Sequence, residues 1–166
     1  MSLRVLGVDP GSIKSGYGLI EESQRKLQTL DFGAIYTHPK DPFPVRLLEI
    51  KRGLEQVIAR YQPEVMALED VFFAKNVKSA LKLGHARGVI LVTAIEAGLE
   101  VVEYAPLEIK QAVVGYGRAD KHQIQQMVKI LLGLRDIPQP EDAADALAVA
   151  ICHIHSAEMK RRLMNL

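Results

Sequence analysis

Three apolar runs near the start of the chain predict the beginning of a β-sheet. The first, residues 3–8, is apolar apart from Arg4, and the turn-forming residues Asp-Pro-Gly-Ser follow it directly. Two further β-like runs, 16–21 and 27–37, are separated only by the polar stretch 22–26. Because short connections of this kind join antiparallel neighbours, we expect these strands to form an antiparallel meander.

The rest of the chain alternates between helical and strand patterns. Apolar residues recur at intervals of three and four between Val45 and Ile58, which predicts an amphipathic helix that ends before Pro63. We expect the remaining elements in this order: a strand at 65–68, a helix at about 76–97, a strand at 100–104, and helices near 106–114, 121–132 and 142–157. This order predicts an α/β fold in which a mixed five-stranded sheet carries helices on both faces.

The composition fits one globular domain that spans residues 1–166. Of these residues, 48% are hydrophobic and 25% are charged, and the length is enough to bury a core without a disulfide or a metal. The longest uninterrupted apolar stretch, 89–92, falls far short of the roughly 20 residues of a membrane span. We therefore expect no membrane segment and a cytoplasmic protein, while the net charge of +1 neither proposes nor excludes a nucleic-acid partner.

Four carboxylates stand where a charged side chain needs a partner. Asp9 and Glu69 each follow an apolar strand directly, so both lie at the carboxyl edge of the sheet if those strands are parallel neighbours. Asp142 and Asp145 begin a helix and share a face with the apolar Val149, which points into the protein. Each acid alone also fits a turn, a solvated strand end or a helix cap. Together they predict a site for Mg²⁺, with Mn²⁺ as a substitute, and a phosphate-ester substrate.

Basic and aromatic residues gather after Glu69. The stretch 71–95 contains no acid, and its basic residues are Lys75, Lys78, Lys82 and Arg87. Lys75, Lys78 and Lys82 are spaced i, i+3, i+7 and form one positive stripe, and a solvated helix face usually mixes charges of both signs. The stripe therefore predicts contact with phosphates, and we expect Arg87 in the same run to bind DNA as well. Strand alternation cannot bury both Phe72 and Phe73, so one of them is expected to be exposed and able to stack on an unpaired base. Lys110 and Lys121, which flank a Gly-Tyr-Gly turn, are each unremarkable surface lysines when taken alone.

The histidines and the cysteine predict no further chemistry. None of the histidines is paired locally with a cysteine or an acid at the spacing of metal ligands, so we expect structural or surface roles for all five, with His85 in the basic helix as the first exception to consider. Cys152 is the only cysteine, which excludes an internal disulfide and a cysteine-only zinc site. We expect it to be a small core residue.

The ordered set of motifs resembles the RuvC family of Holliday-junction resolvases along almost the whole chain. The motifs are LGVDPGS at 6–12 with GYG at 16–18, Glu69 followed by VF and AKN, SALKLG at 79–84, VVG at 113–115 and DAADAL at 142–147. The first motif alone is weak, because a strand that ends in Asp-x-Gly also opens actin-like ATPases and other nuclease-fold proteins. The ordered set is specific.

The resemblance implies a ribonuclease-H-like fold and a homodimeric, Mg²⁺-dependent endonuclease that cuts four-way DNA junctions in recombination and repair. It implies that the catalytic carboxylates are Asp9, Glu69, Asp142 and Asp145. By the same match, Phe72 meets junction bases, and Lys110 and Lys121 serve DNA binding and catalysis. Two partners are also implied, a junction-binding protein and a branch-migration motor, RuvA and RuvB.

Two other functions stay open on the residues alone. The motifs at 9–11 and 16–18 also fit an actin-like nucleotide-binding module, although such proteins close two related domains around the nucleotide. The other is a non-catalytic junction-binding protein, which four intact carboxylates disfavour.

The helix at 76–97 predicts a dimer contact. Gly84 and Gly88 form a line of small residues, and the apolar run 89–92 points around the whole helix circumference. A helix that is apolar all round must be covered on more than one side. We therefore expect a second copy of the chain to cover the side that the sheet does not.

Overall fold

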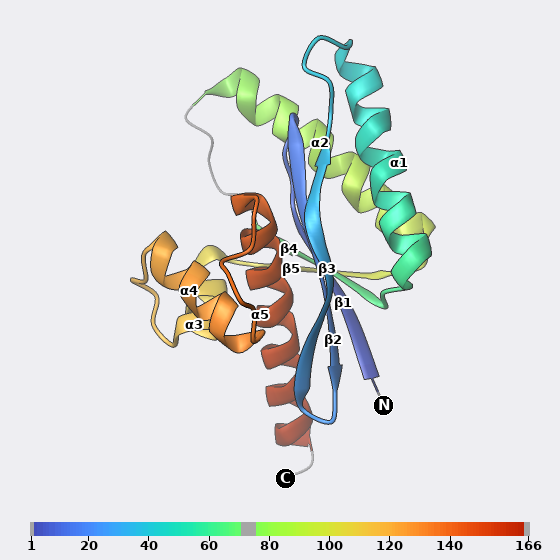
Figure 1. The fold of residues 1–166 in the computed structure, drawn as a ribbon. Helices are drawn as coiled ribbons and strands as arrows, with labels where there is room; N and C mark the ends of the chain where they lie inside the picture. Colours follow the sequence, from blue (N-terminus) through green and yellow to red (C-terminus); the bar gives the residue numbers. More distant parts are fainter. Residues whose placement is uncertain (1, 71–75, 165–166) are drawn as a thin grey trace.

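A mixed five-stranded sheet forms the centre of the computed structural model, which describes residues 2–70 and 76–164 (Figure 1). Its strand order is β3-β2-β1-β4-β5. The first three strands pair antiparallel, whereas β4 and β5 run parallel to β1. The predicted meander is therefore confirmed. The strands are β1 (Ser2–Asp9), β2 (Lys14–Ser23), β3 (Lys26–Tyr36), β4 (Val65–Glu69) and β5 (Glu100–Tyr104).

Helices cover both faces of this sheet, as predicted, and Figure 1 shows them as two layers on opposite sides. One face packs against α1 and α2, and the other packs against α5, with α3 and α4 beside it. In the described part of the chain, no helix is both long and apolar enough to span a membrane. The helices are α1 (Phe43–Tyr61), α2 (Val77–Glu96), α3 (Pro106–Val114), α4 (Lys121–Leu131) and α5 (Glu141–Met164).

The backbone of α5 rests directly on the backbone of β1 and β2, because strand glycines face it. A Cβ atom at Gly7 would collide with the carbonyl group of Ala146, and one at Gly16 would collide with the carbonyl group of Asp142. A third glycine, Gly18, faces the same helix. Only glycine permits so close an approach between two backbones. The contact fixes the first turns of α5 beside the end of β1.

The first half of α5 is buried around almost its whole circumference. Every residue from Ala143 to Ile154 is buried except Asp145, which is partly exposed. Val149 and Cys152 are each 1% exposed, so the predicted inward stripe and the predicted core cysteine are both confirmed. Asp145 is thus an acid in an otherwise apolar setting, which requires a positive partner nearby.

Candidate active site

Two of the four carboxylates end neighbouring strands. Because β1 and β4 are parallel and Val8 pairs with Leu68, Asp9 and Glu69 follow side by side at the carboxyl edge of the sheet. Open α/β sheets bind their ligands at this edge. We expect Asp9 and Glu69 to lie at one edge if their strands are parallel neighbours, and the strands are parallel neighbours.

The other two carboxylates reach the same edge from α5. Gly16 pairs with Asp9 across the β1–β2 ladder and lies against the backbone of Asp142. One helical turn later, Asp145 lines a cleft of about 330 Å³, whose walls also carry Glu69, Lys110 and Lys121. The fold therefore brings together all four predicted carboxylates and both predicted lysines of the Gly-Tyr-Gly turn.

The carboxylates perturb one another electrostatically. Burial, and then the charges of Asp145, Asp142 and Glu69, raise the pKa of Asp9 to about 7. Burial, and then the charge of Asp145, raise the pKa of Glu69 above its ordinary value. Burial also raises the pKa of Asp145, although Lys121 opposes the change. Like charges that disfavour one another's ionised forms in this way favour a bound cation between them.

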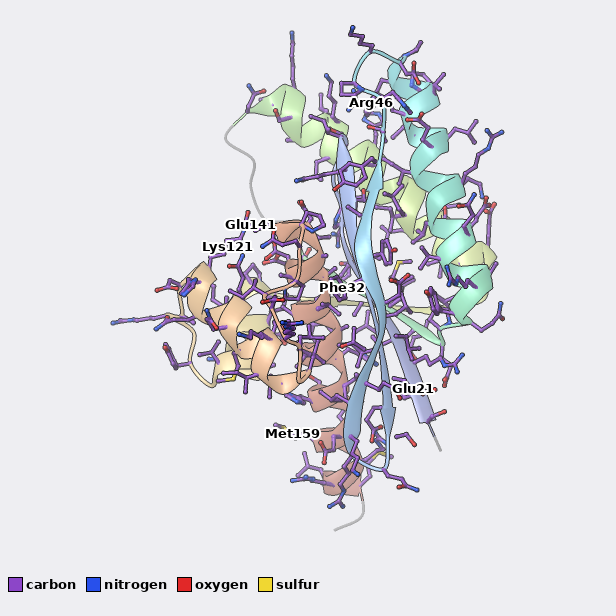
Figure 2. The ribbon with its side chains drawn as sticks, viewed as in Figure 1. Glu21, Phe32, Arg46, Lys121, Glu141 and Met159 are labelled. Atoms are coloured by element: carbon purple, nitrogen blue, oxygen red, sulfur yellow. The ribbon has the colours of Figure 1, made fainter. Side chains whose placement is uncertain are left out.

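Two lysines supply positive charge at the rim of the carboxylate cluster. Lys121 Nζ lies 3.1 Å from Glu141 Oε2 and 3.5 Å from Asp145 Oδ2, and Figure 2 shows Lys121 and Glu141 close together. On the other side, Lys14 Nζ lies 2.9 Å from Asp142 Oδ2. Lys121 is held at the first position of α4, which begins with a capping box between its neighbour Asp120 and Gln123.

The chemistry of the donor set fits Mg²⁺ or Mn²⁺. All four groups offer oxygen atoms, and a divalent cation would relieve the repulsion that helps to raise the pKa values of Asp9, Glu69 and Asp145. The four side chains all belong to the described residues and are neighbours, but no three of them bring one oxygen atom each within 4.8 Å of one another. In residues 2–70 and 76–164, the one set of three ligand atoms within 4.8 Å of one another belongs to a separate group, His38, Asp41 and Glu49.

His38, for which we expect a structural or surface role without a local acidic partner, lies beside two acids in the structure. Its Nδ1 lies 2.9 Å from Glu49 Oε1, and Asp41 completes the group. Asp41 lies only three positions after His38, whereas Glu49 follows eleven positions later on α1, so local spacing reveals the first acid and not the second. His85 Nδ1 donates to the carbonyl oxygen of Leu81 at 2.6 Å, which gives this histidine a partner within its own helix.

The described part of the predicted phosphate-binding stripe lies on α2. Lys78 and Lys82 are exposed on α2, as expected. Phe72, Phe73 and Lys75 lie outside the described residues.

Arg87, which we expect from the basic run to bind DNA, faces the protein. Its side chain is 12% exposed, with Nη1 donating to the Glu69 carbonyl oxygen at 2.7 Å and Nη2 2.9 Å from Glu103 Oε1. Arg87 follows Lys82 by a step of five positions, which turns the direction of the side chain by about 140° around the helix, so the two residues of one basic run point to different sides.

The loop after Asp9 is held by residues that the sequence pattern did not single out. Arg46 is buried on α1, where it donates to the Ser12 carbonyl oxygen and, through Nε, to Thr37 Oγ1 at 3.3 Å (Figure 2). Thr37 Oγ1 in turn donates to the carbonyl oxygen of Ile13 at 2.8 Å. The sequence does give one indication of this role, because Arg46 stands among the apolar residues of a predicted helix. An arginine is rarely buried without a partner.

The chain matches known proteins over nearly its whole length. The family model described as "Crossover junction endodeoxyribonuclease RuvC" matches residues 5–153. The crossover junction endodeoxyribonuclease RuvC of Geobacter sp. (strain M21) is 57% identical over 159 residues, which cover 96% of each chain. The protein of the same name from Caldanaerobacter subterraneus subsp. tengcongensis is 50% identical over 161 residues, which cover 97% of this chain and 98% of that one.

Solved structures agree with these matches. T. thermophilus RuvC in complex with Holliday junction substrate superposes with a TM-score of 0.90 at 37% identity, covering 95% of this chain and 96% of that chain. The yeast mitochondrial Holliday junction resolvase Ydc2 gives a TM-score of 0.71 at 15% identity over 96% of this chain and 81% of that chain, a likeness in fold alone. The predicted ribonuclease-H-like fold of resolvases is thereby confirmed. With its carboxylates converging at one sheet edge and these matches along its length, the chain belongs to the RuvC family of crossover junction endodeoxyribonucleases.

Proposed function

We propose that this chain is one subunit of a homodimeric, Mg²⁺-dependent endonuclease that resolves four-way DNA junctions. Membership of the RuvC family carries the endonuclease activity and sets aside the actin-like and non-catalytic alternatives. The chemistry is supported by the convergence of four carboxylates from β1, β4 and α5 at one edge of the sheet. The charges of neighbouring carboxylates also help to raise the pKa values of Asp9 and Glu69. We assign metal binding and catalysis to Asp9, Glu69, Asp142 and Asp145.

Side chains of the cleft have separate tasks in this proposal. A bound divalent cation supplies activation of water and neutralisation of charge at the scissile phosphate. The four carboxylates hold that cation, and Mn²⁺ serves as a substitute for Mg²⁺. Lys110 and Lys121 line the same cleft, where their ammonium groups bind the oxygens of the scissile phosphate. Lys121 also stabilises the ionised form of Asp145 through their 3.5 Å ion pair.

Junction binding extends from the cleft onto α2. A solved structure of T. thermophilus RuvC contains a Holliday junction substrate, and this chain is 37% identical to it. We propose that the exposed ammonium groups of Lys78 and Lys82 contact DNA phosphates. On the strength of the sequence pattern, Lys75 does the same, and Phe72 stacks on a base at the crossover.

A homodimer is supported by the outward face of α2. Its apolar side chains there are largely exposed: Val77 (75%), Leu81 (59%), Val92 (57%) and Ile95 (64%). Within the same helix, a Cβ atom added at Gly84 or Gly88 would meet no atom within 4 Å beyond its chain neighbours and the nearby backbone of the helix. A second copy of the chain fits this face, because resolving a four-way junction requires two incisions and each chain carries one carboxylate cluster.

Two partners and a location complete the proposal. The family resemblance implies a junction-binding protein, RuvA, and a branch-migration motor, RuvB, that act on the same DNA. We place the enzyme in the cytoplasm with that substrate.

The test is junction cleavage by Glu69→Gln beside the wild type. This change removes a charge from the cluster and nearly preserves the side-chain volume, so we expect junction binding to persist while Mg²⁺-dependent cleavage falls by about 100-fold or more. The matched control is Glu64→Gln, an exposed glutamate just before β4 and far from the cleft, which should cleave like the wild type. Near-normal cleavage by Glu69→Gln in saturating Mg²⁺, or full cleavage by the wild type in EDTA, would contradict the proposal.

A further inference from the structure

We propose that Arg87 is a positioning residue for Glu69. From α2, its guanidinium group fixes the last peptide unit of β4 and thereby the direction in which the Glu69 carboxylate leaves the sheet. The inference rests on the catalytic role proposed above for Glu69. It gives Arg87 a role different from the phosphate contact that the basic run predicts.

A single peptide unit at the end of β4 is held from both sides. Its carbonyl group belongs to Glu69 and accepts a hydrogen bond of 2.7 Å from Arg87 Nη1. Its N–H group belongs to Asp70 and donates to the carbonyl oxygen of Tyr104 on β5, also at 2.7 Å. Because a peptide unit is planar, two bonds on opposite edges fix its orientation. The side chain of Glu69, attached to the adjoining Cα atom, then has a fixed starting direction.

The guanidinium group is itself held in place. Arg87 Nη2 lies 2.9 Å from Glu103 Oε1, on the strand residue next to Tyr104. Within the described residues, Nη2 has no hydrogen-bond partner of good geometry, so this contact with Glu103 is an ion pair. The side chain of Arg87 is 12% exposed, whereas that of Glu103 is 43% exposed. The guanidinium therefore links α2, β4 and β5 at one point and is largely shielded from solvent.

This link suits arginine and not lysine. A guanidinium group spreads its charge over a planar fork, so Nη1 can donate to the carbonyl of Glu69 while Nη2 forms the ion pair with the carboxylate of Glu103. An ammonium group is a compact point charge without that fork. Arg87 thus supports the direction in which the Glu69 carboxylate leaves the sheet.

The experiment compares Arg87→Met, Arg87→Lys and Glu103→Gln with the wild type. Three quantities are measured: the single-turnover rate of junction cleavage with saturating enzyme, the Kd for the junction in EDTA, and the Kd for Mn²⁺ by calorimetry without DNA. Arg52→Met, which removes an exposed arginine of α1, serves as the control for the change in charge.

We expect cleavage and metal binding to change while DNA affinity does not. Removing a partner that orients a metal ligand typically costs 10- to 100-fold. Arg87→Met should cleave about 30-fold more slowly and bind Mn²⁺ about 10-fold more weakly, with a junction Kd within about 3-fold of the wild type. Glu103→Gln should lose about 3- to 10-fold in rate, and Arg87→Lys should recover part of the loss of Arg87→Met. Arg52→Met should match the wild type in all three quantities.

The opposite pattern would overturn the proposal. A junction Kd that rises about 10-fold in Arg87→Met, with a smaller salt dependence and an unchanged single-turnover rate, would show that Arg87 contacts phosphate. Unchanged values in every measurement would also refute the positioning role. If Arg87→Met does not fold, Glu103→Gln and Arg87→Lys decide, and normal rates in both overturn the inference. A wild type that fails to cleave counts against the proposed function instead, and the Mn²⁺ affinities still compare Arg87 with Arg52.

Discussion

Lys14 and Asp142 join the start of β2 to the start of α5 through an ion pair, with Nζ 2.9 Å from Oδ2. Both side chains are partly exposed, at 41% for Lys14 and 25% for Asp142. The hydrogen bond from Lys14 to Asp142, and then the charge of this carboxylate, raise the pKa of the lysine, so Lys14 carries its full charge at neutral pH. One of the four carboxylates is therefore partly neutralised by the chain itself.

Lys14→Met should increase the affinity for Mg²⁺. Without the ammonium group, the carboxylate cluster is more negative and no cation of the chain competes for Asp142. We expect binding about 3-fold tighter, in line with the modest strength of an exposed ion pair. Calorimetric titration of the DNA-free protein measures the affinity for Mg²⁺. The control is Lys26→Met, at the far end of the β2–β3 hairpin. Weaker binding by Lys14→Met would contradict this interpretation of the ion pair.

Gly16→Ala should destabilise the fold far more than a typical glycine substitution in a strand. The added Cβ atom would collide with the carbonyl group of Asp142, so helix and strand must separate, at a cost of about 3 kcal/mol. Gly33→Ala is the matched control on the neighbouring strand, because its Cβ atom would lie 3.1 Å from the Tyr17 hydroxyl, the end of a side chain that can move. Urea unfolding measures both. Equal losses would show that the backbone contact is unimportant.

Asp9→Asn should stabilise the metal-free protein at high pH. The pKa of Asp9 is raised from 3.8 to about 7, so folding disfavours its ionised form. The stability contributed by the protonated form is complete below pH 3.8 and is lost as the pH rises through about 7. In EDTA at pH 8 we expect the variant to be about 2 kcal/mol more stable than the wild type, allowing for the solvent that reaches this partly exposed group.

Thermal and urea unfolding across the pH range test this dependence on Asp9. The advantage of Asp9→Asn should shrink steadily between pH 8 and pH 4. An advantage that stays constant with pH would assign the effect to packing and not to charge.

Gly88→Glu should convert a dimer into a folded monomer. It places a charged side chain in the middle of the exposed apolar face of α2, where a second copy would have to bury it. Sedimentation at micromolar concentration should give a dimer for the wild type and a monomer for the variant, with equal far-UV circular dichroism. Ala59→Glu on the exposed side of α1 is the control. A monomeric wild type, or a dimer that survives both Gly84→Glu and Gly88→Glu, would refute the interface.

Strands, helices and the residues at their ends could be predicted where the local pattern of apolar residues marks them. Asp9 and Glu69 were found because each ends an apolar strand, and parallel neighbouring strands bring such ends together without long-range knowledge. The end of α5 was missed: the helix was expected to stop near 157 but continues to Met164. Its last turns lack an apolar stripe, and Arg161 holds them to β2 through a 3.2 Å ion pair with Glu22.

Contacts between distant segments could not be predicted in the same way. Arg87 shares a charge and a helix with Lys82, so composition grouped them, but the direction of a side chain depends on which side of the helix meets the sheet. The ion pair of Lys14 with Asp142 joins residues far apart along the chain, and it exists because α5 descends onto β2. Such contacts depend on how the helices and strands pack against one another, and the periodicity of the sequence does not reveal them.

The glycine contact between α5 and the first two strands has a consequence for how this nuclease can evolve. Main-chain atoms at Gly7 and Gly16 set the height of the helix above the sheet, so no side chain acts as the spacer between Asp9 and Asp142. Apolar neighbours can be exchanged for others of similar volume while the spacing of the acids stays the same. Substitutions among the apolar core residues therefore leave the spacing of the carboxylates unchanged. The positions that do not tolerate substitution are the glycines, Gly7 and Gly16, which have no side chain.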